Sequence, residues 1–371
     1  MLNAGTATLK AAVMQVDDGR IAEERREQYD WMQASEDQAV AAVLAGIDAP
    51  IDAVAHRVVH GGSSFTKPER LDSAVLEEIE RLIPLAPLHN ARALELIRAA
   101  NAAFPDVPAF ALFDTTFHAQ RPPESAQYAL SVELADRFEL RRYGFHGLAH
   151  ASLVDALAES TGQETADITA VTLQLGSGCS ACAVSNGRSI ETSMGYTPLE
   201  GLAMPRRSGD IDPAIVLRLI RAGLAPDAIE RELTERSGLL GMAGSADVRE
   251  LLRAEARGDE RARLALAIFV RRIVMTAGAY LTLLDGRGML AFGGGIGTHS
   301  PEIRRRISTG LATWNVELDE ARNEANVPGP ISKAGSRDVY VLRTDEESIM
   351  ALAIARVLRD GATAAAPECG S

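Results

Sequence analysis

The chain has 371 residues, 46% of them hydrophobic and 24% charged, and this length and composition predict about two globular domains. Its 38 Lys and Arg against 51 Asp and Glu leave a net charge of −13, which argues against a nucleic-acid partner. The sequence shows no apolar run of the roughly 18–20 residues that a membrane span needs, no secretory signal and only three cysteines, so we expect a cytoplasmic protein with no membrane partner and no disulfide framework.

The first third of the chain alternates short apolar runs with helical patterns. Strands are predicted at Leu9–Val16, Ala53–His60 and Pro108–Phe113. Residues 20–47, which are charged and rich in alanine, have helical spacing and predict a helix. Two amphipathic helices are predicted over residues 71–100, with residues 85–90 as a loop between them because Pro84 and Pro87 interrupt the pattern.

The middle of the chain changes character, because three strand-like runs follow one another closely. They cover Ile168–Leu175, Cys179–Val184 and Arg188–Thr192. Gly176–Gly178 and Asn186–Gly187 are turn sequences between them, so the pattern predicts an antiparallel meander. A glycine-turned hairpin near residue 5, also followed by helices, indicates a second copy of this larger unit.

Helices and single strands alternate in the remaining part. Helices are predicted at residues 213–234, 260–285, 301–307 and 346–359. Strands are predicted at Gly288–Phe292 and Val339–Leu342. A glycine-rich loop, Gly293–Gly297, follows the first of these strands, and residues 361–371 are expected to form a loose tail.

Three glycine-containing turns adjoin predicted strands: Asn3–Thr8, Gly176–Gly178 and Gly293–Gly297. Glycine lets backbone N–H groups approach phosphate oxygens closely, so each turn is a candidate phosphate site, although glycine turns are also ordinary hairpin turns. None of them matches GxxxxGK[ST] or GxGxxG in the required setting, which argues against P-loop and Rossmann folds.

The histidines and cysteines give weaker signals. All seven histidines lie near turns or strand ends, and their spacing does not resemble a closed zinc site. We expect His56, His60 and His150 to be structural. Cys179 and Cys182 form a CxxC pattern inside an alternating strand rather than at a helix start, so we expect buried packing and no redox chemistry.

Two segments place charged residues where a site is expected. Asp114 follows a predicted strand, at the edge where α/β sheets bind their ligands. Arg206 and Arg207 lie in a turn-forming segment before the helix that starts at Pro213. The stretch Thr192–Gly201 before them has no periodicity, and such a long loop is costly unless it builds a site.

Taken together, the motifs of this chain resemble the acetate kinase family, within the larger group of sugar kinase, Hsp70 and actin-like phosphotransferases. They stand in the family's order and cover the chain from end to end: NAGTATLK (Asn3–Lys10), HRVVHGG (His56–Gly62), LAPLHN (Leu85–Asn90), FDTTFH (Phe113–His118), YGFHGLAH (Tyr143–His150), ETSMGYTPLEGLAM (Glu191–Met204), RSGDIDP (Arg207–Pro213), GGIG (Gly294–Gly297) and TDEE (Thr344–Glu347).

This resemblance implies an α/β fold of two ribonuclease H-like (actin-like ATPase) domains with the active site in the cleft between them. The N-terminal domain would comprise residues 1–117 and be completed by the C-terminal helix, residues 347–371. The nucleotide-binding and dimerisation domain would comprise residues 118–346. The implied reaction is reversible transfer of a phosphoryl group from ATP to acetate with Mg²⁺, or Mn²⁺, by a homodimer, giving acetyl phosphate and ADP.

The resemblance also assigns catalytic roles at matching positions. Arg57 and Arg207 would hold the acetate carboxylate and the transferring phosphoryl group. His146 would donate to the equatorial oxygens of that group, and Asp114 would orient the reacting groups or the metal. These residue types suit the chemistry, because a carboxylate nucleophile needs no general base at neutral pH and cations must offset the charge.

The remaining implied contacts are with the metal, the nucleotide and the substrate. Asn3 and Glu346 would support the metal, directly or through water. The phosphate turns would be lined by Thr6, Thr8, Lys10, Gly176, Ser177 and Gly178. The adenosine would be flanked by Asp247, Val248, Arg249, Gly295, Ile296 and Gly297. Acetate would be contacted by Arg57, Val59, Leu88, His89, Phe145 and Pro198. A pocket this small predicts that propionate is a poor substrate.

Some positions depart from the family's pattern. The second phosphate motif, usually HLGNG, reads QLGSG here, so Gln174 and Ser177 replace a histidine and an asparagine donor. Pro205 and Arg206 stand where a Gly-Thr pair is common, and Gly297 is followed by Thr298-His299 instead of an acid and an amide. The chain begins two residues before Asn3, where the family has a full strand, and a start site placed too late would account for this.

Three alternatives therefore stay open beside an acetate kinase. Two keep the phosphoryl transfer but change a partner, with pyrophosphate in place of ATP or propionate in place of acetate. The third is a non-catalytic, actin-like nucleotide-binding protein.

Overall fold

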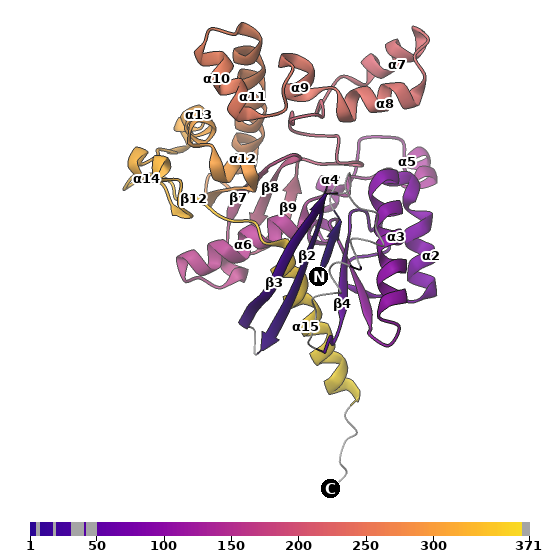
Figure 1. Cartoon of the computed structure of the whole chain (residues 1–371). Coiled ribbons are helices and arrows are strands. Elements are labelled where there is room, and N and C mark those ends of the chain that lie inside the picture. Colours follow the sequence, from indigo (N-terminus) through magenta and orange to yellow (C-terminus); the bar gives the residue numbers. More distant parts are fainter. Residues whose placement is uncertain (5–7, 18–19, 31–40, 42–49, 366–371) are drawn as a thin grey trace. The chain divides into compact units, whose positions relative to one another are not determined.

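The computed structural model describes residues 1–371 except 5–7, 18–19, 31–40, 42–49 and 366–371 (Figure 1). The chain forms two compact units, the first built from Met1–Ala119 and Asp345–Ser371 and the second from Gln120–Thr344. Each unit contains one six-stranded mixed sheet.

The sheet of the first unit has the strand order β3-β2-β1-β4-β6-β5. Its strands are β1 (Leu2–Ala4), β2 (Thr8–Asp17), β3 (Arg20–Asp30), β4 (Val54–Val58), β5 (Glu69–Arg70) and β6 (Ala109–Phe113). β1, β2 and β3 pair antiparallel, whereas β4 lies parallel to both β1 and β6. The predicted strands at residues 9–16, 53–60 and 108–113 are therefore confirmed as β2, β4 and β6.

Two helices of this unit cover one face of the sheet and a third covers the other. α2 (Ser73–Arg81) and α3 (Pro87–Ala103) pack on the face that carries the apolar residues of β1, β4 and β6. Alternate residues of a strand point to opposite faces, so Asn3 lies on the other face from Leu2 and Ala4. On Asn3's face, α15 (Glu346–Ala365) contacts β2, β3 and β4.

The helix predicted over residues 20–47 is wrong in its first part, because residues 20–30 form β3. Helical spacing of charged residues is a weak preference, and pairing with β2 along its whole length overrides it. The exposure of the described side chains of β3 alternates along the strand, as expected where successive side chains point to opposite faces. The rest of that prediction, residues 31–47, lies outside the described residues except for residue 41, which is helical.

The loop predicted at residues 85–90 is also wrong in part. Ile83–Leu85 form a short 3₁₀ turn, η1, and Pro87 begins α3. Proline is favoured at the first position of a helix, where its missing N–H would have no helical partner. Residues 87–90 are therefore the first turn of α3, and His89 and Asn90 are helical.

The sheet of the second unit has the strand order β11-β12-β10-β7-β8-β9. Its strands are β7 (Ala170–Leu175), β8 (Cys179–Ser185), β9 (Arg188–Thr192), β10 (Met289–Gly293), β11 (Gly329–Pro330) and β12 (Val339–Val341). The predicted antiparallel meander is confirmed as β7, β8 and β9. β10 lies parallel to both β7 and β12.

Helices account for most of the remaining second unit. α6 (Gly147–Thr161) and α11 (Glu260–Leu283) contact the sheet at β7, β10 and β8. The other helices are α4 (Pro123–Ala126), α5 (Val132–Phe138), α7 (Pro213–Arg221), α8 (Pro226–Glu235), α9 (Gly238–Ala243), α10 (Val248–Ala256), α12 (Gly294–His299), α13 (Pro301–Gly310) and α14 (Glu320–Ala325). Short 3₁₀ turns are η2 (Thr116–His118) of the first unit and η3 (Thr165–Asp167) and η4 (Ala312–Trp314) of the second.

The two sheets repeat one topology. In each, a three-stranded antiparallel meander is followed by two parallel strands that extend the sheet from the first strand of the meander. A short antiparallel strand, β5 or β11, then closes the edge beyond the second parallel strand. The repeat inferred from the glycine-turned hairpins is thus seen in the strand order of both units, and it is the arrangement of the ribonuclease H-like, actin-like fold.

Some predicted boundaries in the second half of the chain are wrong. The predicted loop Gly293–Gly297 is mostly helix, because Gly294 adopts φ +73° and the chain then enters α12 directly. A Cβ on Gly294 would collide with the backbone of Leu175, so this sharp turn requires glycine. The final helix also runs farther than expected, to Ala365, so that residues 361–365 are not tail.

One helix bears on the expectation of no membrane span. α11 is long and apolar enough to cross a bilayer by length and composition alone. Arg271 and Arg272 fall in its middle, and a row of its apolar residues, among them Leu266, Phe269 and Ile273, is buried. These features are those of a core helix of a folded domain, which passes the same length and composition test.

Candidate active site

Four of the predicted residues form a polar cluster in the first unit. Asn3 lies in β1, Arg57 in β4, Asp114 directly after β6, and Glu346 at the start of α15. Arg57 donates from Nε and Nη2 to the two carboxylate oxygens of Asp114, at 2.8 and 2.6 Å, and from Nη1 to Asn3 Oδ1 at 3.0 Å. Asn3 Nδ2 donates to Glu346 Oε2 at 2.8 Å, so the structure brings the four residues together.

Glu347 belongs to the same cluster and was missed from the sequence. Asn3 Nδ2 donates to its Oε1 at 2.6 Å, and the residue is only 4% exposed. The signal was present, because Glu346 and Glu347 stand side by side in the TDEE motif. Only the helix geometry shows that both carboxylates reach the same amide.

The charges of this cluster do not cancel. Burial by itself would lower the pKa of Arg57, but the attraction of Asp114 and Glu346 outweighs it and raises that pKa above its ordinary value. The guanidinium therefore stays charged, and it faces three carboxylates. Even with Arg26, whose Nη1 lies 3.6 Å from Glu347, the carboxylates outnumber the guanidinium groups.

The cluster fits a hard divalent cation. Its donors are carboxylate and amide oxygens, which Mg²⁺ and similar ions prefer. In the described parts of the chain, no three His, Cys, Asp or Glu side chains are arranged to hold a metal by themselves. Mg²⁺ beside a nucleotide is usually held by one or two protein carboxylates, with water and substrate phosphates completing its shell.

The second unit contains a different cluster, built around Gly178. A Cβ on this glycine would lie 3.0 Å from His146 Cε1, 3.1 Å from His146 Nε2 and 3.7 Å from Arg207 Nη1. His146 is half-buried in the left-handed conformation, with φ 59°, directly before α6. Two side chains that carry N–H groups thus border a backbone position that has no side chain, which is an arrangement suited to a bound anion.

Arg207 is held differently from Arg57. Its Nη1 donates to the backbone carbonyl of Pro198 at 3.2 Å, and burial lowers its pKa from the ordinary value. The carbonyl is neutral, so this bond does not compensate the positive charge of Arg207. An anion beside Gly178 would supply the missing compensation.

Three buried side chains lie in a row behind His146. Ser180 Oγ lies 2.8 Å from His146 Nδ1 and 2.8 Å from His150 Nε2, and His150 Nδ1 lies 2.8 Å from Thr172 Oγ1. His150, Ser180 and Thr172 are completely buried. We predicted His150 to be structural, and its two hydrogen bonds inside the core agree with that, but the sequence did not show its link to His146.

The second glycine turn lies next to the third. The backbone N–H of Gly176 donates to Gly178 O at 2.9 Å, and a Cβ on Gly176 would lie 3.9 Å from Gly295 N. Gln174, one of the departures from the family pattern, accepts through Oε1 from Thr344 Oγ1 at 2.8 Å, and Thr344 Oγ1 accepts from Gly294 N at 3.3 Å. Gln174 therefore ties the end of β7 to the start of α12.

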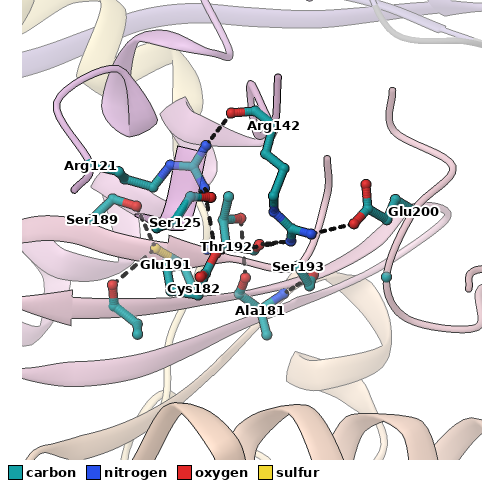
Figure 2. Close-up of polar contacts among 12 residues, drawn as sticks. Arg121, Ser125, Arg142, Ala181, Cys182, Ser189, Glu191, Thr192, Ser193 and Glu200 are labelled. Carbon is teal, nitrogen blue, oxygen red and sulfur yellow. Dashed lines mark hydrogen bonds and ion pairs between the residues drawn. The ribbon is translucent and has the colours of Figure 1, made fainter. Parts of the chain in front are cut away.

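A network of arginines and carboxylates lies around β9 and the segment that follows it, up to Glu200 (Figure 2). Arg121 is buried, donates to Ser125 Oγ at 3.2 Å and lies 3.5 Å from Glu191. Arg142 donates to Thr192 O at 2.9 Å and pairs with Glu200 (Figure 2). Both carboxylates stand in the ETSMGYTPLEGLAM motif, so the segment is held at Glu191 in β9, just before it begins, and again at Glu200.

The predicted adenosine residues lie at the surface of the second unit, apart from Val248 and Gly297, which are buried. Asp247 caps α10 by accepting from Arg249 N at 2.8 Å, and its carboxylate also pairs with the Arg249 guanidinium. The hydrogen bond from that side chain lowers the pKa of Asp247 to about 2. Gly295 and Ile296 are in α12, and contact of these residues with adenosine stays a prediction.

The residues predicted to contact acetate are divided between the units. Val59 is buried directly after β4, and His89 is half-buried in the first turn of α3. Phe145 is buried beside His146, and Pro198 binds Arg207 through its carbonyl. The side chain of Leu88 lies outside the described part of the chain. A common pocket for these residues stays a prediction.

The first predicted phosphate turn is described only in part. Thr6 and the side chain of Thr8 lie outside the described residues. Lys10 is exposed in β2, opposite Asn3 in the strand register. In the second turn, Ser177 is exposed.

The buried-packing interpretation of the CxxC pattern agrees with the structure. Cys179 and Cys182 are buried in β8, and burial raises the pKa of each thiol to about 12. Cys369 lies outside the described residues. His60 accepts from Gly62 N at 2.9 Å, and His56 is buried in the sheet of the first unit, which agrees with structural roles for both.

Two repeated sheets, one acidic cluster suited to a cation and one glycine cradle suited to an anion define a phosphotransferase of the actin-like ATPase fold. A family model described as the acetokinase family matches residues 2–352. The chain belongs to the acetokinase family, and its reaction class is that of a phosphotransferase with a carboxyl group as acceptor.

Individual relatives agree with this placement. The acetate kinase of Streptomyces coelicolor is 45% identical over 319 residues, which are 84% of this chain and 78% of that protein. The crystal structure of Porphyromonas gingivalis acetate kinase has a TM-score of 0.86 at 31% identity, covering 96% of this chain and 98% of that one. A propionate kinase from Francisella tularensis has a TM-score of 0.84 at 33% identity, covering 95% and 97%.

Proposed function

We propose that this protein catalyses the reversible transfer of the γ-phosphoryl group of ATP to acetate, giving acetyl phosphate and ADP, with Mg²⁺ as the metal. The observation that carries the proposal is the convergence of His146 and Arg207 on Gly178. The acidic cluster at Asn3 supports a divalent cation as the companion of the nucleotide. Membership of the acetokinase family supports ATP and acetate as the substrates.

The reaction requires no covalent intermediate with the protein. An acetate oxygen forms a bond to the γ-phosphorus, the bond from that phosphorus to the bridging oxygen breaks, and ADP leaves with the electron pair. Acetate is already ionised at neutral pH, so no residue has to remove a proton. What remains is to align the two reactants and to offset the charge of the transferring group.

In the first unit, Arg57 would bind the acetate carboxylate. Asp114 and Asn3 hold its guanidinium in one orientation, so Asp114 acts here by positioning Arg57. Asn3, Glu346 and Glu347 would hold the metal, which neutralises phosphate charge when it is bound.

In the second unit, His146 and Arg207 would donate to the equatorial oxygens of the transferring phosphoryl group. Arg207 is suited to this because its guanidinium stays charged and is bound to a neutral carbonyl. The backbone of Gly176–Gly178, tied to α12 through Gln174 and Thr344, would line the phosphates of the nucleotide. Asp247, Arg249 and residues 295–297 would flank the adenosine.

Assembly and location complete the proposal. The two domains would be residues 1–117 with 347–371 and residues 118–346. A homodimer in the cytoplasm is proposed, formed mainly through the second unit, where α11 leaves Leu264, Met275 and Leu283 more than half exposed. Light scattering coupled to size exclusion would measure the oligomeric state, and a monomer at micromolar concentration would contradict the dimer.

The test of the proposed function is acyl phosphate formation, trapped as the hydroxamate. Purified protein is given ATP and Mg²⁺ with acetate, with propionate, or with no acid, and a parallel series replaces ATP by pyrophosphate. We expect product with ATP and acetate, less with propionate, and none with pyrophosphate. Product with pyrophosphate alone would overturn the nucleotide, and no product with either donor from folded protein would overturn the catalytic proposal.

A further inference from the structure

The hydrogen-bonded row behind His146 consists of four side chains from three elements. Thr172 is in β7, Ser180 is in β8, and His146 and His150 stand at the start and in the first turn of α6. The three successive contacts are all 2.8 Å, which is a good hydrogen-bond distance. Each contact holds one proton, so the direction in which one hydroxyl donates sets the direction of the whole row.

Two directions are chemically possible. In the first, Thr172 donates to His150 Nδ1, His150 Nε2–H donates to Ser180, and Ser180 donates to His146 Nδ1. Neutral His146 then carries its proton on Nε2. In the second, every proton is reversed, and neutral His146 carries its proton on Nδ1 and has a lone pair on Nε2.

The first direction makes the better hydrogen bonds. It uses the Thr172 hydroxyl proton in the 2.8 Å contact with His150. The second direction must send that proton to Cys182 O, which lies 3.5 Å away, at the limit of a hydrogen bond. Because all three hydroxyl and ring groups behind His146 are buried, water does not replace a poor bond there.

The surroundings of His146 favour the same direction. Nε2 faces the cradle at Gly178, which the Arg207 guanidinium also borders. An anion there is attracted by an Nε2–H group and repelled by an Nε2 lone pair. The positive charge of Arg207 also disfavours a second cation on His146, so the neutral ring is the form that has to donate. The thiol of Cys179, next to Gly178, is kept neutral by burial, and His150 is the other titratable group in the row.

We propose that Thr172, His150 and Ser180 are positioning residues that hold neutral His146 with its proton on Nε2, aimed at the phosphoryl group. This inference rests on the proposed function of His146 and goes beyond it, because it assigns a catalytic effect to a threonine that is two side chains removed from His146. Its consequence is that phosphoryl transfer does not need an imidazolium and persists above the ordinary histidine pKa of about 6.5.

The experiment compares Thr172→Val with Thr172→Ser. Valine has nearly the shape of threonine but no hydroxyl, whereas serine keeps the hydroxyl and loses a methyl group. For Thr172→Val we expect kcat at pH 8 to fall about tenfold, with KM for acetate changed less than about twofold, since a transition-state donor is weakened. As the pH is lowered the loss becomes smaller, because an imidazolium carries a proton on both ring nitrogens whatever the direction of the row. Thr172→Ser keeps the wild-type pH profile.

A second measurement locates the proton on the His146 ring directly. Nitrogen-15 NMR of histidine-labelled wild-type protein, with Thr172→Val beside it, distinguishes protonated from unprotonated ring nitrogens, and His146→Gln assigns the signal. We expect the proton of neutral His146 on Nε2 at pH 8 in the wild type. A proton on Nδ1 of neutral His146 in the wild type would overturn the proposal, and so would a pH profile of kcat in Thr172→Val equal to that of the wild type. If wild-type protein forms no acyl phosphate, the proposed function fails, and the NMR result still decides the direction of the row.

Discussion

The two polar clusters of this protein differ in the way that they hold an arginine. Arg57 in the first unit is bound by both oxygens of a buried carboxylate and lies among three acidic side chains. Arg207 in the second unit is bound by a backbone carbonyl, and its neighbours are a histidine and a glycine. The first arginine is part of the folded core, whereas the second has a charge that a ligand can use directly.

The comparison indicates that Arg57 contributes to stability as well as to the proposed function, whereas Arg207 contributes mainly to function. The first cluster has surplus negative charge and suits a cation. The second has surplus positive charge and suits an anion. A phosphoryl transfer that uses a metal and a nucleotide needs one site for a cation and one for an anion. Substitutions in the two clusters should therefore have separable effects on the free energy of unfolding and on activity.

The largest effect is expected for Arg57→Ala. The carboxylate of Asp114 is 1% exposed and would lose its partner, so we expect the free energy of unfolding to fall by about 3–5 kcal/mol and acyl phosphate formation to disappear. Denaturant unfolding with and without Mg²⁺ measures this, and the stabilisation by Mg²⁺ should be larger in the variant than in the wild type. Arg57→Lys keeps the charge and should recover part of the stability. Wild-type stability for Arg57→Ala would show that the ion pair is not structural.

Arg207→Ala should separate activity from stability. We expect kcat to fall about 10²–10³-fold, as for loss of one transition-state donor, with a change in unfolding free energy of only about 1 kcal/mol, since one bond to a carbonyl is lost. The neighbouring Arg206 is exposed, so Arg206→Ala is the matched control and should keep the wild-type rate. Near wild-type activity of Arg207→Ala would mean that the transferring group is bound elsewhere.

A smaller effect is expected for Glu347→Gln. The substitution keeps the size of the side chain but removes one of the three negative charges of the cluster around Asn3 and Arg57. We expect the Mg²⁺ concentration for half-maximal rate to rise about 10–100-fold, while the rate at saturating Mg²⁺ changes little. Titration of activity with Mg²⁺ measures the shift. An unchanged Mg²⁺ dependence would exclude Glu347 from the metal site and leave it a structural acceptor for Asn3.

The smallest effect is expected in the pH dependence of stability, where the buried histidines His56 and His150 differ. His150 has two hydrogen bonds, whereas both ring nitrogens of His56 have no partner among the described residues. Burial lowers the pKa of His56 to about 3, while the unfolded chain titrates near 6.5. The unfolded state therefore binds the proton first, so this histidine's contribution to stability is present above pH 6.5 and is lost as the pH falls toward 3.

The variant His56→Leu tests this direction of the pH dependence of stability. The wild type should lose roughly 1.4 kcal/mol per pH unit through this residue below pH 6.5, and the variant should lack this part of the slope. Unfolding free energies between pH 6.5 and 5 measure it before most carboxylates titrate. His299 is exposed, and His299→Leu is the matched control substitution. An equal slope in His56→Leu and the wild type would show that His56 already binds a proton in the folded state.

Much of the candidate site was predictable because its residues stand next to strand ends and glycine turns. Asn3, Arg57, Asp114 and Glu346 were named from motifs, and they meet in the first unit. Glu347, Thr172 and Ser180 were given no role in the site, and His150 was expected only to be structural. Apart from the TDEE motif at Glu347, no local pattern marks their contacts, since their partners are between 22 and 344 residues away along the chain.

The sequence by itself determined the strands of both sheets that carry continuous apolar runs, the repeated hairpin unit, the family and the residue types of the chemistry. Burial and turn preferences are local properties, so they are visible in the order of residues. The tertiary structure alone decided that residues 20–30 pair as a strand, that both glutamates of α15 reach Asn3, and that a threonine in β7 is linked to His146. These features depend on which surfaces meet after folding, and a side chain's partner across a sheet is not a property of its neighbours in the chain.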